Sequence, residues 1–351
     1  MRTAIDLFAG VGGLSLGFEQ AGFKIVWANE FNKSIADAYK KNHPYTIVDS
    51  RDIRDIDIQE EFKKYIGNID VVMGGPPCQG FSQKGKRIGL NDERNFMFQK
   101  FVEVVSIVRP KFFVLENVPN ILTAEKGYFK DQIINSFCKL GYHLDVKILK
   151  AENYGVPQIR RRAVFIGKLG KDMEYKIPDF ANSKVCVEDA IGDLPILLSG
   201  EGVNFVEYSH KPMNKYQEEM RKGSDGIWNH VATNHNKAAL DRLKYVSLTS
   251  TKNDLPKEQQ TKSIYSGTWT RINPKGLVRT ITTRFDTPAS GQFTLPFQDR
   301  CLTVREAARL QSFPDTFIFY GNKTNQMLQV GNAVPPMLAK VIAETILKNF
   351  N

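Results

Sequence analysis

The first half of the chain alternates short apolar runs with amphipathic segments. The runs with the length and apolar content of buried strands are Thr3–Phe8, Lys24–Ala28, Val71–Met73, Lys111–Leu115, Leu144–Leu149 and Ala163–Ile166. The segments with apolar residues at helical spacing are Leu14–Ala21, Ser34–Lys41 and Phe96–Val108. Strands that alternate with crossover helices predict an α/β fold with a doubly wound, mostly parallel sheet.

The pattern changes near Lys168. From there to about Ser290 the sequence is polar and irregular, which predicts short strands and loops in a second, smaller domain. Helical spacing returns over Thr303–Phe313, and Gly331–Pro336 is predicted to start a final helix that runs through Ile346. We therefore expect a larger domain over 1–180 that is completed by the C-terminal segment 326–351. The smaller domain is expected over 181–325.

Charge and cysteine usage narrow the function. The chain has 351 residues and a formal net charge of +10, which favours a polyanionic partner such as a nucleic acid. The four cysteines are scattered without a C-x-x-C pair, so neither a zinc site nor a disulfide framework is expected. No apolar run approaches the roughly 20 residues that span a bilayer. Asp6 interrupts any signal sequence. We expect a cytoplasmic protein.

One cysteine stands in a position suited to chemistry. The stretch Gly74–Ser82 reads GGPPCQGFS and places Cys78 directly after an apolar run and two prolines. Active sites of open α/β sheets lie just outside such strand ends. Cys78 is therefore a candidate nucleophile. A single cysteine, taken alone, is more often a small buried apolar residue, and the two prolines and the polar residues that follow favour the catalytic role.

A glycine-rich turn and three acidic positions, one of them in the turn itself, suggest a ligand with a ribose. The segment Asp6–Gly13 reads DLFAGVGG and passes from a strand into a helix, where main-chain N–H groups are unpaired. Glu30 ends the second strand, where an acidic residue can bind ribose hydroxyls. Asp52 is a third acidic position, predicted to follow a third strand. The spacing G-x-G-G lacks the pyrophosphate-binding pattern, so S-adenosylmethionine fits better than NAD.

These motifs, in this order, resemble the DNA cytosine-5 methyltransferases of bacterial restriction–modification systems. The matching blocks are Asp6–Gly13, Asn29–Glu30, Gly75–Gln79, Glu116–Val118, Gln158–Arg162, Arg305–Gln311 and Gly331–Val334. Together these blocks cover about residues 1–167 and 300–351. Each block alone is a weak pattern, and the resemblance rests on their shared order. The resemblance implies the S-adenosylmethionine-dependent methyltransferase fold. It also implies that 181–325 is a target-recognition domain and hinge.

The resemblance assigns roles residue by residue. It implies that Cys78 adds to carbon 6 of a cytosine that has been rotated out of the DNA helix. Glu116 would then hold a proton at ring nitrogen 3, while Arg160 and Arg162 contact the base and the surroundings of the cysteine. The implied cofactor is S-adenosyl-L-methionine. Its implied contacts are Asp6, Phe8, Ala9, Gly10, Gly12 and Gly13 in the turn, Glu30 at the ribose, Asp52 and Ile53 at the adenine, Pro77 near the sulfonium, and Asn332 and Ala333 closing the pocket.

The expected partner is double-stranded DNA. A glycine-hinged, basic segment over 80–95 is expected to close over DNA through Ser82, Lys84 and Arg87. Candidates for contact with the target are Arg271 and Arg284, with Trp228 and Trp269 beside them. We expect a monomer in a bacterial cytoplasm, and a cognate restriction endonuclease, if present, would act separately.

Other functions stay open at this point. An RNA cytosine-5 methyltransferase of the same architecture, acting on tRNA, would share the Pro-Pro-Cys-Gln block. The long segment 170–290 favours DNA, because reading base pairs in the major groove needs a dedicated surface. An inactive DNA-binding regulator is disfavoured by the intact Cys78, Glu116 and Arg162. Amino-group methyltransferases are disfavoured because their Asp/Asn/Ser-Pro-Pro-aromatic block is absent from the sequence.

Overall fold

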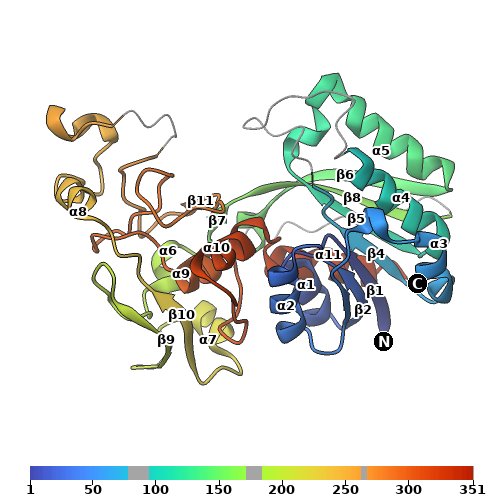
Figure 1. Ribbon diagram of the computed structural model, residues 1–351, viewed down its shortest axis with the longest axis horizontal. Coiled ribbons are helices and arrows are strands. Elements are labelled where there is room, and N and C mark those ends of the chain that lie inside the picture. The colour runs from blue at the N-terminus through green and yellow to red at the C-terminus, as the bar shows by residue number, and fades with distance from the viewer. Residues whose placement is uncertain (78–94, 171–183, 262–266, 351) are drawn as a thin grey trace. The chain divides into compact units, whose positions relative to one another are not determined.

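The computed structural model describes residues 1–77, 95–170, 184–261 and 267–350 (Figure 1). The chain divides into two compact units. Unit 1 comprises Met1–Lys150, Arg161–Asp179 and Pro336–Asn351, and unit 2 comprises Ala151–Arg160 and Phe180–Pro335. The expected boundaries differ from this division at two places. Residues 151–160 and 326–335 group with unit 2.

Unit 1 is built on a seven-stranded sheet in the order β3-β2-β1-β4-β5-β8-β6. Its strands are β1 (Arg2–Leu7), β2 (Phe23–Asn29), β3 (Ile47–Asp49), β4 (Val71–Gly74), β5 (Phe112–Asn117), β6 (Tyr142–Lys150) and β8 (Arg161–Leu169). Neighbours from β3 to β5 pair in parallel, and β8 runs antiparallel to both β5 and β6. This confirms the predicted mostly parallel sheet.

Helices cover both faces of this sheet. The helices of unit 1 are α1 (Gly13–Gln20), α2 (Lys33–Asn42), α3 (Ile58–Phe62), α4 (Asn95–Val108), α5 (Tyr128–Lys139) and α11 (Pro336–Leu347). A buried core joins Ile5 and Leu7 of β1 to Phe101 of α4 and Phe137 of α5. On the other face α1 packs against α11, where a Cβ on Gly17 would lie 2.4 Å from Cβ of Ala339. The glycine therefore allows this close contact.

Unit 2 holds short strands and short helices. They are β7 (Gln158–Ile159), β9 (Gly202–Glu207), β10 (Gly226–Val231), β11 (Val278–Arg279), α6 (Val187–Ile191), α7 (Lys215–Arg221), α8 (Lys237–Leu243), α9 (Val304–Leu310) and α10 (Lys323–Asn332). β9 and β10 form an antiparallel pair, while β7 and β11 form a parallel pair. Thr303 begins α9 with a capping box, because its hydroxyl accepts from the Glu306 N–H and the Glu306 carboxylate accepts from the Thr303 N–H.

One expected helix boundary is wrong. Gly331 and Asn332 end α10 instead of starting the last helix, and α11 begins only at Pro336. Ala333 between them is extended, with φ −65° and ψ 149°. The consecutive prolines explain why α11 begins only at Pro336, because Val334 and Pro335 each precede a proline and are disfavoured in the helical region.

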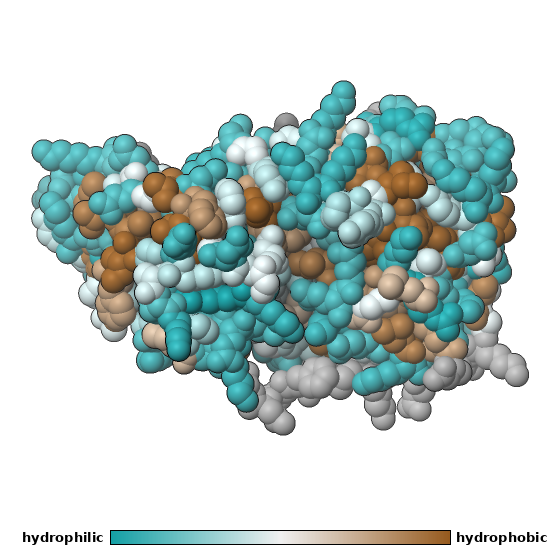
Figure 2. All heavy atoms as spheres, turned by 90° about the horizontal axis from the view of Figure 1, so that it is seen from below, coloured by the Kyte–Doolittle hydropathy of each residue, from teal (hydrophilic) through white to brown (hydrophobic). Residues whose placement is uncertain are grey.

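The surface is mixed in character. On the face in Figure 2, apolar side chains lie in patches separated by hydrophilic ones. Among the residues that the structure describes, no helix is long and apolar enough to cross a bilayer.

Candidate active site

The turn between β1 and α1 has an unusual backbone. Phe8, Gly10 and Gly12 all adopt positive φ, at 58°, 57° and 94°. A non-glycine residue in this region costs on the order of 1–3 kcal/mol, so Phe8 must be held there by its surroundings. The Ala9 N–H donates to the Asn29 carbonyl at 2.9 Å, which ties the turn to the end of β2. A Cβ built on Gly10 would meet no atom of the described residues within 4 Å, so the described part of the chain leaves the turn open at that glycine.

Glu30 binds this turn from the end of β2. One carboxylate oxygen accepts from the Gly10 N–H at 3.1 Å, and the other accepts from the Asn32 N–H at 2.8 Å. Burial raises the pKa of the Glu30 carboxyl above its ordinary value. Each oxygen of a carboxylate has two acceptor positions, so Glu30 keeps capacity for two hydroxyl donors. That is the chemistry that a ribose needs.

Beside Glu30 lies an aromatic residue that sequence reasoning missed. Phe31 directly follows Glu30 and is 68% exposed. The signal was present in the sequence as an aromatic residue next to the acid at a strand end. An exposed ring at this position offers a flat apolar surface to a base.

Asp52 and Ile53 follow β3 in a short helical turn. The Asp52 carboxylate accepts from the Arg54 N–H at 2.9 Å and forms an ion pair with the Arg54 guanidinium at 2.7 Å. The hydrogen bond from Arg54 lowers the pKa of Asp52. Ile53 is buried. The open turn and Glu30 therefore offer hydrogen-bonding groups, and the exposed Phe31 offers apolar surface, which fits S-adenosylmethionine.

Asp6 lies at the start of the turn and is buried. Its side chain is buried, and one oxygen accepts a hydrogen bond from the Ser15 hydroxyl at 2.6 Å. The other oxygen is a buried atom with no hydrogen-bond partner among the described residues. Burial, with smaller contributions from Glu19 and Glu30, raises the pKa of Asp6 to about 7, although the Ser15 hydrogen bond opposes this. Asp6 is thus a second carboxyl group, besides Glu30, whose pKa is raised at the turn.

The raised pKa of Asp6 makes stability depend on pH. Between the ordinary value of 3.8 and about 7, the folded chain binds a proton that the unfolded chain releases. The stabilisation is complete below pH 3.8 and is lost as the pH rises to about 7, at up to about 1.4 kcal/mol per pH unit. Asp6→Asn is expected to reduce the slope of the urea-unfolding midpoint against pH between pH 5 and 7. The exposed control Asp37→Asn should keep the wild-type slope, and an unchanged slope in Asp6→Asn would contradict this assignment.

Glu116 and Arg162 meet at the ends of β5 and β8. Glu116 pairs with Val164 in the antiparallel register, which puts Arg162 diagonally opposite on the same face. Arg162 Nε lies 2.7 Å from Glu116 Oε1, and both side chains are nearly buried. The other carboxylate oxygen lies close to the end of β4, 3.1 Å from where a Cβ on Gly75 would stand. The acid–arginine pair therefore lies against the Gly75–Pro77 segment.

Asn117, the residue after Glu116, fixes this segment. Its side-chain amide donates to the Pro76 carbonyl at 2.9 Å. The Asn117 side-chain oxygen accepts from the Val118 N–H at 2.9 Å, which orients the amide. The sequence analysis included Asn117 in the Glu116–Val118 block but predicted no role for it. Cys78, Ser82, Lys84, Arg87 and the expected closing segment 80–95 lie outside the described residues, apart from the start of α4.

The Arg160 side chain forms hydrogen bonds with main-chain carbonyls of unit 2. Its side chain is buried and donates to the carbonyls of Ile281 at 3.2 Å, Gly331 at 3.2 Å and Ala333 at 2.8 Å. Asn332 is exposed and Ala333 is buried, and both belong to unit 2 with Arg160. The guanidinium of Arg160 thus joins 281 to the end of α10.

The candidates for DNA contact differ in exposure. Arg271 is buried and donates to the carbonyls of Leu243, Val246, Leu295 and Gln298, and it also pairs with Asp299. The Arg271 guanidinium is therefore bonded to groups of unit 2 itself. Arg284 has a side chain that is 63% exposed and pairs with Asp286 at 3.1 Å. Trp269 is buried in a small core with Leu243, Val246 and Leu255, whereas Trp228 is half-buried and packs against Phe205.

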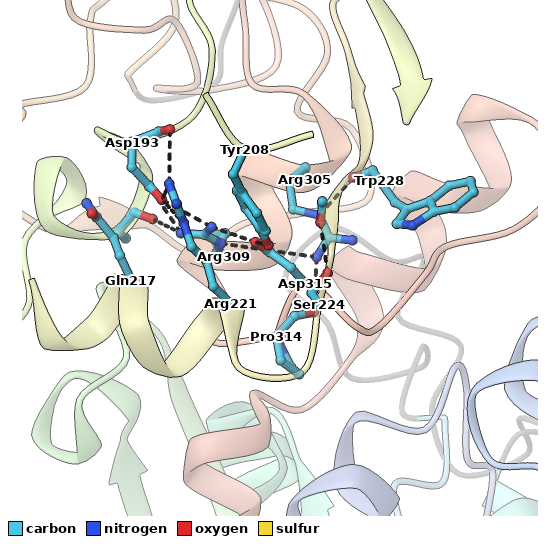
Figure 3. A network of polar contacts seen from close by, with 12 residues as sticks. Asp193, Tyr208, Gln217, Arg221, Ser224, Trp228, Arg305, Arg309, Pro314 and Asp315 are labelled. Atoms are coloured by element: carbon cyan, nitrogen blue, oxygen red, sulfur yellow. Dashed lines mark hydrogen bonds and ion pairs between the residues drawn. The ribbon is translucent and has the colours of Figure 1, made fainter. Parts of the chain in front are cut away.

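The Arg305–Gln311 block forms a buried ionic network (Figure 3). Arg309 donates to both oxygens of Asp315 at 2.6 Å and contacts Asp193 at 3.2 Å. Asp193 also accepts from Arg221 at 2.7 Å, and Asp315 accepts from the Tyr208 hydroxyl at 2.6 Å. The hydrogen bond from Arg309 and the charges of Arg305 and Arg309 lower the pKa of Asp315, although burial opposes them. The block therefore joins α6, α7 and α9 within unit 2.

Comparisons with known proteins agree with this geometry. The family model for C-5 cytosine-specific DNA methylases matches residues 2–348. The chain is 39% identical to the type II methyltransferase M.DdeI of Desulfomicrobium norvegicum, over 97% of this chain and 88% of that protein. It is 38% identical to the type II methyltransferase M1.HphI of Haemophilus parahaemolyticus, over 99% and 87%.

Solved structures agree on the fold. A prophage-encoded DNA modification methyltransferase of E. coli matches with a TM-score of 0.80 and 29% identity over 99% of both chains. The Dnmt2 methyltransferase of S. pombe, at 18% identity, shares the fold with a TM-score of 0.61 over 100% of both chains. The family model spans nearly the whole chain. The chain belongs to the C-5 cytosine-specific DNA methylase family and is a DNA cytosine-5 methyltransferase.

Proposed function

We propose that the protein methylates carbon 5 of one cytosine within a specific sequence of double-stranded DNA, through a transient bond between Cys78 and carbon 6. The observation that carries this proposal is the Glu116–Arg162 pair, held 2.7 Å apart beside the Gly75–Pro77 segment that leads to Cys78. An acid next to a candidate nucleophile is the arrangement that covalent catalysis on a pyrimidine needs.

Each group in this arrangement has one task. The Cys78 thiolate forms a bond to carbon 6, and the displaced electron pair is accommodated at ring nitrogen 3, where Glu116 supplies a proton. Carbon 5 thereby becomes nucleophilic. After methylation a base removes the proton from carbon 5, the bond to Cys78 breaks, and 5-methylcytosine is released. Arg162 orients the Glu116 carboxyl, and Asn117 holds the Pro76 carbonyl. The target base must leave the duplex stack to reach these groups.

The cofactor would be held by the turn after β1. S-adenosylmethionine supplies an electrophilic methyl group when it is bound. Glu30 would accept from the ribose hydroxyls, Phe31 and Ile53 would contact the adenine, and the open backbone at Gly10 would receive the methionine part. Phe8, Ala9 and Gly13 shape the turn, with Pro77, Asn332 and Ala333 kept as further candidate contacts. Asp6 and Gly12 act beneath the turn.

The roles of the remaining arginines are assigned from whether their side chains are exposed or buried. Arg284 is retained as a DNA contact together with Ser82, Lys84 and Arg87, whereas Arg160 and Arg271 are assigned to positioning the main chain of unit 2. Because the relatives are type II methyltransferases, we infer that the protein is the modification enzyme of a restriction–modification system. It would act as a monomer in the cytoplasm, separately from any endonuclease.

The covalent step is testable with a modified base. Bisulfite sequencing of DNA from cells that express the protein first identifies the methylated cytosine. Duplex DNA with 5-fluorocytosine at that position has no proton to lose from carbon 5, so the wild-type enzyme with S-adenosylmethionine is expected to form a complex that survives denaturation.

Two controls sharpen this test. Cys78→Ala should bind the same DNA without forming the denaturation-resistant complex, and unmodified DNA should give no such complex with the wild type. A stable complex formed equally by Cys78→Ala would refute the covalent role of Cys78.

A further inference from the structure

Beneath the cofactor turn lies a buried polar ladder that the proposed chemistry does not use. The ladder consists of Asp6, Ser15, Glu19, Tyr39 and His43. The Ser15 and Tyr39 hydroxyl oxygens lie 2.7 Å apart, and Ser15 also donates to Asp6 at 2.6 Å. His43 Nδ1 lies 2.8 Å from a Glu19 carboxylate oxygen. Ser15 and Glu19 are four residues apart on α1, and Tyr39 lies four residues before His43, the residue that follows α2, so the two contacts lie about one helical turn apart.

The ladder contacts the turn directly. A Cβ on Gly12 would lie 2.3 Å from His43 Nε2 and 2.8 Å from Tyr39 Cε2. The two rings therefore pack against the α-carbon of Gly12 and leave no room for a side chain. Their centroids are 4.3 Å apart, so they form one continuous surface beneath the turn.

The turn is thus held from two directions. Glu30 holds it through the Gly10 N–H at 3.1 Å, and the ladder supports it at Gly12. The Gly12 N–H donates to the Ala9 carbonyl at 3.0 Å, and the Gly12 carbonyl accepts from the Leu16 N–H at 2.8 Å. A shift of Tyr39 or His43 is therefore transmitted to the backbone that faces the open space at Gly10.

Burying the polar side chains of the ladder costs free energy that apolar side chains filling the same space would not cost. Asp6, Ser15, Tyr39 and His43 are all almost fully buried. Apolar residues of similar size are often as stable as a buried polar network, because polar groups lose hydration on burial. Directional hydrogen bonds fix one geometry, which an apolar contact does not.

We propose that this ladder is a positioning device that sets the affinity of the turn for the cofactor. The inference rests on the proposed function, because it takes the turn to be the S-adenosylmethionine site. Tyr39 and Ser15 are positioning residues in this view, since they act through Gly12 and do not touch the reacting atoms.

Tyr39→Phe isolates the hydroxyl and keeps the ring against Gly12. The matched control is Tyr142→Phe in the same unit, where the buried hydroxyl donates to the Pro110 carbonyl at 2.7 Å in the core on the opposite face of the sheet. Tyr39→Phe is expected to raise the KM for S-adenosylmethionine and the calorimetric Kd for S-adenosylhomocysteine on the order of fivefold. The kcat at saturating cofactor should stay at the wild-type value. Tyr142→Phe should lower the melting temperature similarly and leave KM and Kd unchanged.

Ser15→Ala and the double variant complete the test. If the two hydroxyls act together, Tyr39→Phe in a Ser15→Ala background should add little to the rise in Kd. The inference is overturned if Tyr39→Phe and Tyr142→Phe lower the melting temperature alike and neither changes KM or Kd. Failure of the wild type to bind S-adenosylhomocysteine would instead overturn the proposed function, and this inference with it.

Discussion

Glu116→Gln is expected to slow methyl transfer by about 10²–10⁴-fold at saturating DNA and cofactor. Glutamine keeps the size of the side chain and an oxygen near Arg162, but it cannot supply a proton to ring nitrogen 3. The ion pair at 2.7 Å becomes a weaker polar contact, while the β5–β8 pairing is retained. Single-turnover transfer of labelled methyl groups measures the chemical step, and binding of DNA and S-adenosylhomocysteine should stay near wild type.

A matched glutamate separates chemistry from a general loss of charge. Glu103→Gln on α4 removes an exposed carboxylate that pairs with Lys100 at 3.0 Å, and its methylation rate should equal that of the wild type. If Glu116→Gln turns over at a near-normal rate, Glu116 is not the proton donor.

Arg309→Ala is expected to destabilise unit 2 by about 3–5 kcal/mol, because it leaves buried carboxylates without their cation. Arg309 holds Asp315 through two hydrogen bonds of 2.6 Å and also contacts Asp193, and all three side chains are fully buried (Figure 3). Arg221 and Arg305 remain near these acids, so Asp193 and Asp315 keep part of their compensation. The loss should fall mainly on unit 2.

Tryptophan fluorescence can follow that unit. Trp228 and Trp269 lie in unit 2 and Trp27 lies in unit 1, so a Trp27→Phe background reports the unfolding of unit 2 in urea. Lys244→Ala is the control, because the Lys244–Asp241 pair is exposed to solvent and such pairs contribute little to stability. An Arg309→Ala midpoint equal to that of Lys244→Ala would show that the network does not stabilise the unit.

The sequence predicted the centre of the sheet well for a physical reason. β1, β4 and β5 are buried on both faces, so they read as nearly unbroken apolar runs. α5 was not predicted because it buries only a narrow stripe, formed by Phe129, Ile133 and Phe137. The break between α10 and α11 comes just before Pro336. The sequence predicted that the last helix starts within Gly331–Pro336, but Gly331 and Asn332 still belong to α10.

The candidate site was predictable where strand ends determine it. Glu30 and Glu116 end strands of one sheet, so their location follows from topology. Arg271 shows the limit, because its partners are mainly main-chain carbonyls, 24 to 28 residues away for the bonds to Leu243, Val246 and Leu295. A carbonyl group is present at every residue and leaves no mark in a sequence. The burial of Arg160 was hidden for the same reason. The ladder beneath Gly12 was hidden because its contacts join side chains that are distant in sequence.

The contact between α1 and α11 has a consequence for synthesis on the ribosome. Gly17 can receive Ala339 only after translation has reached the last helix, although α1 is among the first segments to emerge. Until then the nascent chain exposes the face of α1 that α11 later covers. We therefore expect unit 1 to complete its packing only after unit 2 has been translated.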